Sequence, residues 1–362
     1  MAKRQKTDIH DVAEAAGVSV STVSRALNGY SDVSAKTRRK VEKVAAKMGY
    51  QPHFGATVLR KNATRTITFM VSKPWAKFVD PYFLAVLDGL ELALATQSYD
   101  LQVVLARDFD QEQDVVRRIV ERNRSDALIF ARTRPEDERI DWLEKRKFPF
   151  VTIGQTNRNS HSFIDRDQCA IAKEATLRLA GLGHQSIAHF MTPLRYTYSV
   201  LGRAGYREAM EECGLGIEKA IERECFLSRN TGEEMVLELF AKGRAPTAIL
   251  CGNDMIAISA MEGLKRLGLQ PGIDVALIGC DDIPLAAHVH PSLTSFSQDL
   301  DAMGMRLSRM VLAQLGEDGT VEQEVVQSRL IIRESDCVVP NVRKNLIRKQ
   351  STDGSGKLRS TP

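Results

Sequence analysis

The sequence TDIHDVAEAAGVSVSTVSRALNG, residues 7–29, decides the fold of the N-terminal part of this chain. Its pattern predicts two short helices joined by a tight turn. Thr7 is expected to cap the first helix, and Gly17 is expected to end it. Ser19 should cap the second helix, in which Val23 points inward. Two helices separated by so few residues have the spacing of a helix-turn-helix.

The second helix presents a surface that suits the major groove of DNA. Its outward side chains are short, except for one long cation: Val20, Ser21, Ser24 and Arg25. A valine can contact a thymine methyl group, a serine can bond to base edges or phosphates, and an arginine can bind guanine through two hydrogen bonds. We therefore expect Val20, Ser21 and Arg25 to read bases. The alternative is a helical hairpin with an ordinary solvated face.

Positive charge is concentrated at the N-terminal end. Residues 1–65 hold thirteen Lys or Arg against five Asp or Glu, a net charge of +8, whereas the whole chain carries +4. The remainder therefore carries −4, and a basic head on a faintly acidic body indicates phosphate contact at one end. A third helix, capped by Ser34, should bury four apolar residues at helical spacing: Val41, Val44, Ala45 and Met48.

Several short motifs in this head resemble one family. Asp11-Val12-Ala13, Gly17-Val18-Ser19, Thr22-Val23-Ser24-Arg25, residues 33–38 and Gly49-Tyr50-Gln51-Pro52 resemble the DNA-binding head of the LacI/GalR family of bacterial transcriptional regulators. The resemblance extends from residue 7 to about residue 340. It implies a head followed by a two-lobed body like that of a periplasmic sugar-binding protein. Thr22 and Thr37 lie in the matched motifs and complete the expected DNA contacts.

The chain is expected to have four regions. They are a helix-turn-helix domain (1–52), a hinge (53–65), an effector-binding and dimerisation domain (66–340) and a disordered basic tail (341–362). The resemblance implies that Leu59 of two chains enters the minor groove once the hinge folds on DNA. Gly55 weakens a helix there by about 1 kcal/mol, so folding of the hinge should depend more strongly on DNA. The alternative for Leu59 is packing against the body.

From residue 66, apolar runs alternate with helical stretches. The runs are 67–71, 101–106, 127–131, 150–153, 187–191, 248–251 and 275–279. This alternation predicts an α/β body in which helices cover parallel sheets. The resemblance divides the body into two lobes joined by three crossovers: 66–162 plus 294–323, and 163–293 plus 324–340. Ligands collect at the carboxyl ends of such strands, so the effector is expected between the lobes.

Seven residues are predicted to bind the effector: Ser72, Phe83, Tyr198, Arg203, Asn253, Asp281 and Gln298. An amide and a carboxylate, such as Asn253 and Asp281, suit pairs of sugar hydroxyls. By resemblance, Asp281 matches the effector-binding aspartate of the family, and Ser72, Phe83 and Gln298 face the cleft. Asp254 is expected to cap the helix that follows its strand.

The predicted site departs from the family at two positions. Cys280 replaces the usual aromatic residue, and Gly202 replaces an effector-binding arginine. Arg203 lies one residue later, a rotation of about 100 degrees on a helix, so an effector that needs the arginine is in doubt. The segment 150–156 with Phe163-Ile164-Asp165 is similar to a branch that responds to α-glucosides. A sugar or sugar derivative is expected; a nucleobase or another metabolite stays open.

Other functional classes lack their motifs. Asp281 and Asp282 are adjacent on a strand and point to opposite faces, and His288 and His290 lack the spacing of a helical metal site. Six scattered cysteines indicate neither a zinc site nor a disulfide framework. We expect no enzyme, no cofactor and no metal.

The expected assembly is a cytoplasmic homodimer on near-palindromic operator DNA. The N-terminus lacks the apolar run of a signal peptide, and no stretch approaches a membrane span. The alternative of a sugar-binding module without a regulatory role would require a signal peptide and no DNA-binding head. The tail lacks leucine heptads, so a coiled-coil tetramer is not expected.

Overall fold

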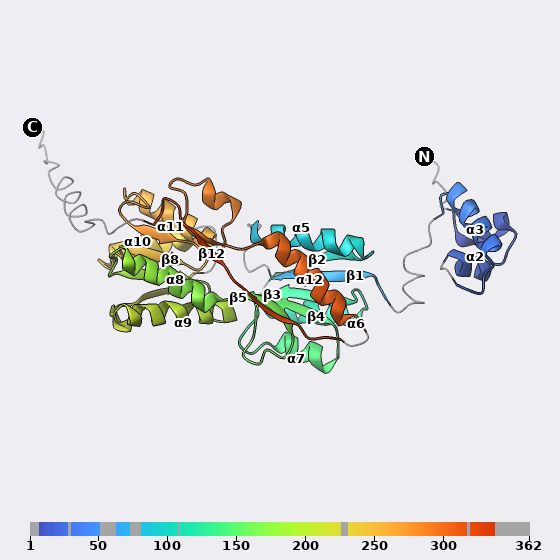
Figure 1. The fold of residues 1–362 in the computed structure, drawn as a ribbon, viewed down its shortest axis with the longest axis horizontal. Helices are drawn as coiled ribbons and strands as arrows, with labels where there is room; N and C mark the ends of the chain where they lie inside the picture. The colour runs from blue at the N-terminus through green and yellow to red at the C-terminus, as the bar shows by residue number, and fades with distance from the viewer. Residues whose placement is uncertain are drawn as a thin grey trace, which may run out of the picture. The chain divides into compact units, whose positions relative to one another are not determined.

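The computed structural model describes residues 7–27, 30–50, 63–72, 81–107, 109–225, 231–316 and 319–336. The chain divides into two compact units, residues 1–65 and residues 66–362. The first unit is a helical head and the second is an α/β body (Figure 1). Most of the predicted hinge, with Gly55 and Leu59, and the whole predicted tail lie outside the described residues.

The head is built from three helices: α1 (Ile9–Ala16), α2 (Val20–Leu27) and α3 (Ala35–Lys47). Gly17 ends α1 as predicted, with a left-handed φ of 62°. The prediction for the other end was wrong, because Asp8 caps α1 in place of Thr7. The Asp8 carboxylate accepts hydrogen bonds from two backbone N–H groups of the first turn. Thr7 instead donates its hydroxyl to Met48 O, 3.2 Å away, at the end of α3.

Two serine caps and a small apolar core hold the head together. The hydroxyls of Ser19 and Ser34 each accept a hydrogen bond of 3.2 Å from the backbone N–H three residues later, which confirms both caps. The core contains Val12, Ala13, Ala16, Val23, Ala26, Val41, Ala45 and Tyr50. Burial of Val23 and Val41 fixes which faces of α2 and α3 remain outside.

The first lobe of the body is a six-stranded parallel sheet in the order β11-β5-β4-β3-β1-β2. Its strands are β1 (Thr66–Ser72), β2 (Asp100–Ala106), β3 (Ala127–Ala131), β4 (Phe150–Ile153), β5 (Ser162–Arg166) and β11 (Gln323–Val326). Helices α5 (Pro81–Thr96) and α12 (Leu300–Gln314) share one apolar core with the sheet. Helices α6 (Phe109–Glu121) and α7 (Glu138–Lys145) share another.

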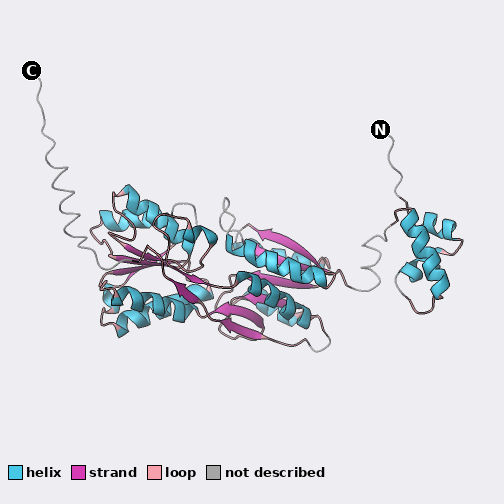
Figure 2. Cartoon of the chain, turned by 45° about the horizontal axis from the view of Figure 1, so that its top comes forward, coloured by secondary structure: helices cyan, strands magenta, loops and turns pink. Residues whose placement is uncertain are grey.

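The second lobe has a four-stranded parallel sheet in the order β7-β6-β8-β9. Its strands are β6 (Ile187–Met191), β7 (Ile221–Glu224), β8 (Ala248–Cys251) and β9 (Ala276–Ile278). Helices α8 (Gln168–Gly181) and α9 (Thr197–Glu212) cover one face, and α10 (Thr231–Ala241) and α11 (Asp254–Arg266) cover the other (Figure 2). The predicted α/β class with helix-covered parallel sheets is confirmed.

Three stretches of chain cross between the lobes. The first follows β5, the second joins β10 (Ser295–Ser297) to α12, and the third joins β11 to β12 (Arg329–Ile331). Strands β10 and β12 form a separate antiparallel pair. The lobe limits expected near residues 162 and 323 fall beside or inside β5 and β11, which both belong to the first sheet. The chain therefore leaves the first lobe after Arg166 and after Val326.

Candidate functional site

Helix α2 presents the predicted DNA-contacting side chains at the surface of the head. Ser21 and Arg25 are exposed, and three further residues are partly exposed: Val20, Thr22 and Ser24. The opposite face of α2 is buried through Val23 and Ala26. Thr37 is partly exposed in the first turn of α3, whereas Leu59 lies outside the described residues. The helix therefore offers one continuous polar face to a partner.

Arg25 has an internal partner in the head. Its guanidinium pairs with the Asp32 carboxylate and lies 5.8 Å from the centre of the Tyr30 ring. Both charged side chains are 46% exposed, so water screens the pair. A guanine that binds Arg25 must replace Asp32 as its partner.

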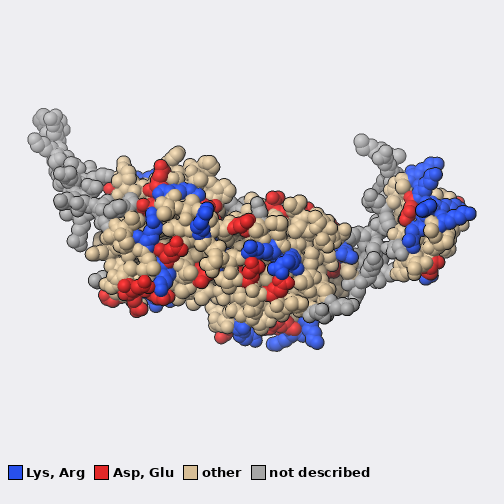
Figure 3. Space-filling model, viewed as in Figure 1, with Lys and Arg blue, Asp and Glu red and all other residues tan. Residues whose placement is uncertain are grey.

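Helix α3 carries most of the positive charge in the described part of the head. This helix carries six cations and one acid: Lys36, Arg38, Arg39, Lys40, Lys43, Lys47 and Glu42. Figure 3 shows Lys and Arg gathered on the visible face of the head, whereas both signs of charge alternate over the visible face of the body. A basic surface beside a polar helix face matches the phosphate and base contacts that duplex DNA requires.

A cavity of about 90 Å³ lies between the two lobes of the body. It opens at the carboxyl ends of strands from both sheets. Its wall consists of Tyr82, Phe83, Ala131, Arg132, Ile153, Gly154, Asp165, Arg166, Gln168, Thr192, Tyr198, Gly252, Asn253, Asp281 and Met303. Four of the seven predicted effector residues therefore meet here: Phe83, Tyr198, Asn253 and Asp281. Among the described residues, this cavity brings together polar groups from both lobes on a partly aromatic wall.

An ion pair crosses this cavity between the lobes. Arg166 ends β5 in the first lobe, and its guanidinium donates to Asp281 Oδ1, 3.0 Å away, in the second lobe. A second guanidinium nitrogen donates to the carbonyl oxygen of Cys280. Asp165, the neighbour of Arg166, is 5% exposed, and burial raises the pKa of its carboxyl group, although backbone N–H groups donate to it. The wall thus combines two carboxylates with two guanidinium groups.

The cap that the sequence predicted at Asp254 lies one residue earlier, at Asn253, which also lines the cavity. Asn253 is the cap of α11, because its Oδ1 accepts a hydrogen bond of 2.8 Å from Ile256 N. Asp254 is fully buried and points away from the helix N-terminus. Its carboxylate accepts hydrogen bonds from Cys280 N at 2.8 Å and Ile283 N at 2.9 Å. The predicted cap at Asp254 was wrong; this residue fixes the loop that carries Asp281.

Three predicted effector residues do not line the cavity. Arg203 Nε donates to Glu222 Oε2, 3.0 Å away, on the strand β7 at the edge of the second sheet. This is the rotation expected for a residue one step past Gly202. Ser72 ends β1, and its hydroxyl, like the side-chain amide of Gln298, is buried without a hydrogen-bond partner among the described residues.

Several residues of the cavity wall were not predicted from the sequence. Arg132 follows β3, its guanidinium donates to Ser72 O, and it lies 5.4 Å from the centre of the Phe83 ring. Asp165 and Arg166 were missed because β5 ends in two charged residues and was not recognised as a strand. The available signal was the apolar pair Phe163-Ile164 directly before these charges.

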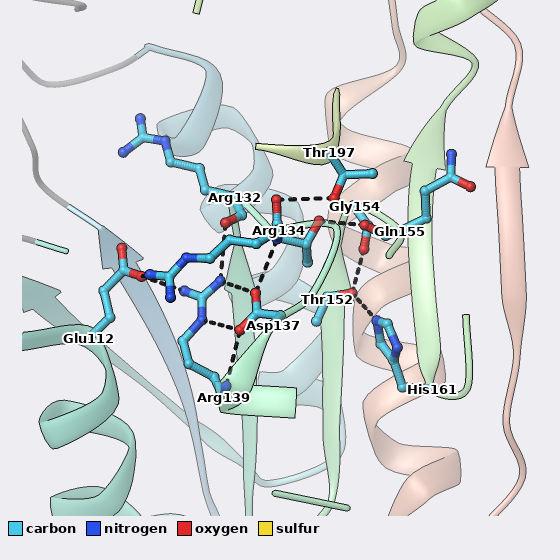
Figure 4. Close-up of polar contacts among 11 residues, drawn as sticks. Glu112, Arg132, Arg134, Asp137, Arg139, Thr152, Gly154, Gln155, His161 and Thr197 are labelled. Carbon is cyan, nitrogen blue, oxygen red and sulfur yellow. Dashed lines mark hydrogen bonds and ion pairs between the residues drawn. The ribbon is translucent and has the colours of Figure 1, made fainter. Parts of the chain in front are cut away.

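A buried ionic cluster supports the loop that follows β3 (Figure 4). Arg139 is fully buried; it donates two hydrogen bonds to Asp137, at 2.8 and 2.6 Å, and one of 2.9 Å to Glu112. The supported loop contacts the second lobe, because Thr133 O accepts a hydrogen bond of 2.9 Å from Thr197 N at the start of α9. The same helix start carries Tyr198, whose ring stacks on Tyr196 at 5.6 Å. The cluster thus connects the first lobe to a helix that lines the cavity.

Metal and membrane features are as follows. Within the ranges that the structure describes, no group of three or more His, Cys, Asp or Glu side chains is arranged to hold a metal ion. No helix in those ranges is both long and apolar enough to span a bilayer.

Two family models match the chain. The model of the bacterial regulatory proteins of the lacI family matches residues 8–53, and that of the periplasmic binding protein-like domain matches residues 176–335. The HTH-type transcriptional regulator RafR of Escherichia coli is 32% identical over 303 residues, which cover 83% of this chain and 89% of RafR. The HTH-type transcriptional regulator AglR of Rhizobium meliloti (strain 1021) is 29% identical over 341 residues, which cover 92% of this chain and 95% of AglR.

The fold is similar to that of a solved repressor. The crystal structure of the lac repressor dimer bound to operator and the anti-inducer ONPF superimposes with a TM-score of 0.80 at 26% identity. The match covers 92% of this chain and 100% of that chain. Head and body therefore both have counterparts in a protein that is bound to DNA and to a small molecule.

Proposed function

The chain belongs to the LacI family of bacterial regulatory proteins and is a DNA-binding transcriptional regulator, and we propose that it is a repressor controlled by a sugar. The observation that carries the proposal is the pairing of two sites in one chain. A helix-turn-helix presents a polar face, and a cavity between two lobes gathers carboxylate, amide and guanidinium groups. The first suits DNA, and the second suits a small polar ligand.

DNA recognition is assigned to α2 and its surroundings. We propose that Val20, Ser21 and Arg25 read each half-site, and that Ser24, Thr22 and Thr37 contact base edges or phosphates. The exposure of these side chains on one side of the head supports the assignment. Leu59 remains a prediction for the centre of the operator. The basic face of α3 supplies the sequence-independent attraction to phosphate.

We propose that two copies bind one near-palindromic operator as a homodimer. Strand β2 forms one edge of the first sheet and exposes Val103 (46%) and Leu105 (52%), while α5 exposes Leu84 (56%) and Leu92 (66%). Exposed apolar side chains on an edge strand and a helix of one lobe are typical of a surface that another protein covers. A two-fold symmetric pair matches a palindromic DNA site.

The effector is assigned to the cavity between the lobes. Phe83 and Tyr198 supply aromatic surface, and Asn253, Asp165 and Asp281 supply oxygen or amide groups that bind hydroxyls. Aromatic faces with a few convergent polar groups suit a sugar better than a nucleobase, which would stack between apolar walls. Arg203 is left out of the proposed site because Glu222 holds it elsewhere. We also propose Ser72 and Gln298 as effector contacts, because their buried polar atoms have no hydrogen-bond partner among the described residues.

We further propose that the chain has no enzymatic activity and acts in the cytoplasm, where its operator lies. The relatives that support this proposal are transcriptional regulators. A sugar bound in the cavity would change operator affinity through coupling of typically about 1–3 kcal/mol.

Selection of binding sites from random DNA tests the proposed regulator. The full chain should enrich an inverted repeat, and a sugar that raises its melting temperature should change affinity for the enriched site by about 5- to 150-fold. A sugar consumed during the assay would contradict the assignment as a pure binding protein. A nucleobase that alone stabilises the chain and changes operator affinity would replace the sugar as effector.

A further inference from the structure

A second cavity lies inside the second lobe, directly beside the pocket between the lobes. Its volume is about 20 Å³, and it lies between the strand β6 and the helices α8 and α9. Four residues line both cavities: Gln168, Thr192, Tyr198 and Gly252. The two cavities therefore share part of their wall, so a ligand in the pocket would lie directly beside the smaller cavity.

Gly202 explains why this space exists. A Cβ atom added at Gly202 would meet nothing nearer than Gln168 O, at 4.0 Å, whereas one added at Gly205 would lie 2.0 Å from Cys169 O. Helices α8 and α9 thus touch at Gly205 and leave room one turn earlier. Because Gly202 has no side chain, that room is not filled from α9.

His189 lines this cavity and carries a buried ring nitrogen. It lies on β6, is 3% exposed, and its ring packs on Tyr206 with 5.0 Å between ring centres. Its Nδ1 atom is buried without a hydrogen-bond partner among the described residues. Burial lowers the pKa of His189 to about 4, so the ring is neutral near pH 7. A neutral imidazole offers one donor and one acceptor, which match a hydroxyl group and not an anion.

We propose that this second cavity, here named the His189 subsite, receives one hydroxyl or hydroxymethyl group of an uncharged sugar bound in the pocket, and that His189 Nδ1 forms a hydrogen bond with it. The inference rests on the proposed sugar effector and narrows its chemistry. A volume of about 20 Å³ holds roughly one water-sized group, so the subsite takes a single substituent. A phosphate group is both larger and charged, and the subsite excludes it.

Two substitutions test the subsite, one by filling it and the other by removing its polar atom. Gly202→Leu fills the cavity, and His189→Phe keeps an aromatic ring against Tyr206 but removes Nδ1. Gly181→Leu is the matched control, because Gly181 is an exposed helical glycine at the end of α8 with no atom within 4 Å of its added Cβ. Unfolding of each variant without sugar shows whether it folds.

The probes are glucose, galactose, maltose, cellobiose, melibiose, raffinose and glucose 6-phosphate, screened by thermal shift against the full chain. The uncharged sugar that raises the melting temperature most is then titrated calorimetrically into each variant. We expect Gly202→Leu and His189→Phe to weaken its binding at least tenfold, and Gly181→Leu to change it less than twofold. A crystal structure of the complex should place a sugar oxygen within hydrogen-bond distance of Nδ1.

Four results would overturn the inference. Unchanged affinity in both folded variants, or a buried water as the only partner of Nδ1 in the sugar complex, removes the subsite and leaves the sugar effector standing. Tighter binding of glucose 6-phosphate than of every uncharged sugar removes the requirement for a neutral ligand. If no sugar of the panel raises the melting temperature, the sugar effector fails, and the subsite fails with it.

Discussion

Arg166 and Asp281 form an ion pair, 3.0 Å long, that links the end of a strand in the first lobe to the loop after a strand in the second. The two residues are 115 positions apart in the chain and both line the same cavity. A ligand that binds Asp281 therefore acts directly on a contact between the lobes. The carboxylate that we propose as a ligand-binding group is therefore also part of the contact between the lobes.

We expect Asp281→Ala to abolish the effect of the sugar on operator affinity, because the acceptor of two hydroxyl bonds is lost. Operator binding without sugar should persist, since the head is a compact unit separate from the body that contains Asp281. Asp282→Ala is the control: Asp282 lies on the same loop and pairs with Arg333, but it does not line the cavity. Fluorescence-anisotropy titration of operator DNA with and without sugar measures both variants. A normal sugar response in Asp281→Ala would remove Asp281 from the site.

We expect Arg25→Ala to remove discrimination at one base pair of each half-site, at a cost of about 1–3 kcal/mol. Asp32→Asn should instead strengthen binding to all DNA, because it releases Arg25 and removes a negative charge near phosphate. The stability of the head should change by no more than about 1 kcal/mol, since the pair is half-exposed. Site selection from random DNA checks the assignment: an unchanged base preference in Arg25→Ala contradicts it.

We expect Arg139→Met to lower the free energy of unfolding by about 3–5 kcal/mol, because Asp137 would remain buried without its cation and Glu112 would keep only Arg134. Arg146→Met is the control. Arg146 is 46% exposed and its nearest carboxylate oxygen is 3.9 Å away, so its loss should cost at most about 1 kcal/mol. Urea unfolding of the isolated variants measures both. Equal stability of the two would show that the buried cluster contributes no net stabilisation.

We expect the stability of the body to fall as the pH drops from 6.5 towards 4. Burial lowers the pKa values of His161 and His189 from 6.5 to about 4, so the unfolded chain binds more protons in this window. The free energy of unfolding should therefore rise with pH up to about 6.5, by at most roughly 1.4 kcal/mol per pH unit and histidine, and these two groups should add nothing above it. Urea unfolding at pH 5, 6 and 7.5 measures the slope, and His189→Phe should reduce it.

We expect Gly205→Ala to destabilise the second lobe by about 1–3 kcal/mol or more, because its added Cβ would lie 2.0 Å from the carbonyl oxygen of Cys169. The backbone of α8 would have to move away from α9. Gly181→Ala, on an open helix surface, should leave stability unchanged or raise it slightly. Thermal unfolding distinguishes the two, and equal melting temperatures would mean that the helices separate at little cost.

The parts of the fold that local pattern determines were predicted from the sequence. The strands β3, β4, β6 and β8 begin and end at the predicted residues, because each is a mostly apolar run whose residues are all buried, with Thr152 in β4 and His189 in β6 as the polar members. The hydroxyls of the caps Ser19 and Ser34 accept a hydrogen bond from the backbone N–H three residues later in the chain. A window of four residues is therefore enough to predict such a cap.

The strands β5 and β7 could not be found in the same way. β7 reads IERE, and only Ile221 in it is buried, because this strand lies at the edge of its sheet and pairs its Glu222 with Arg203 and Arg207. β5 ends in Asp165 and Arg166, whose charges are compensated inside the fold. A prediction from local sequence places such charged residues at the surface, because their ion-pair and hydrogen-bond partners lie far away in the sequence.

The cap of α11, predicted at Asp254 and found at Asn253, shows a second limit of sequence-based prediction. Both residue types cap helices well, and the sequence places the two side by side. Which one caps depends on the residue at which the helix begins, and a shift of one position sends the other side chain into the interior. In the interior, four groups from residues 280–295 donate hydrogen bonds to the Asp254 carboxylate. These residues lie near Asp254 only in the folded chain.

Strand β1 connects the first residue of the body to the wall of the cavity. It begins at Thr66, the first residue after the unit that holds the head, and ends at Ser72, whose carbonyl oxygen is bound by Arg132 of the cavity wall. Seven residues of extended chain span about 20 Å. Strands β2 and β3 pair with β1 on its two sides, so its two ends should move together without a change in the length of the strand. A tilt of the sheet at the cavity would therefore move Thr66, the residue at which the body begins.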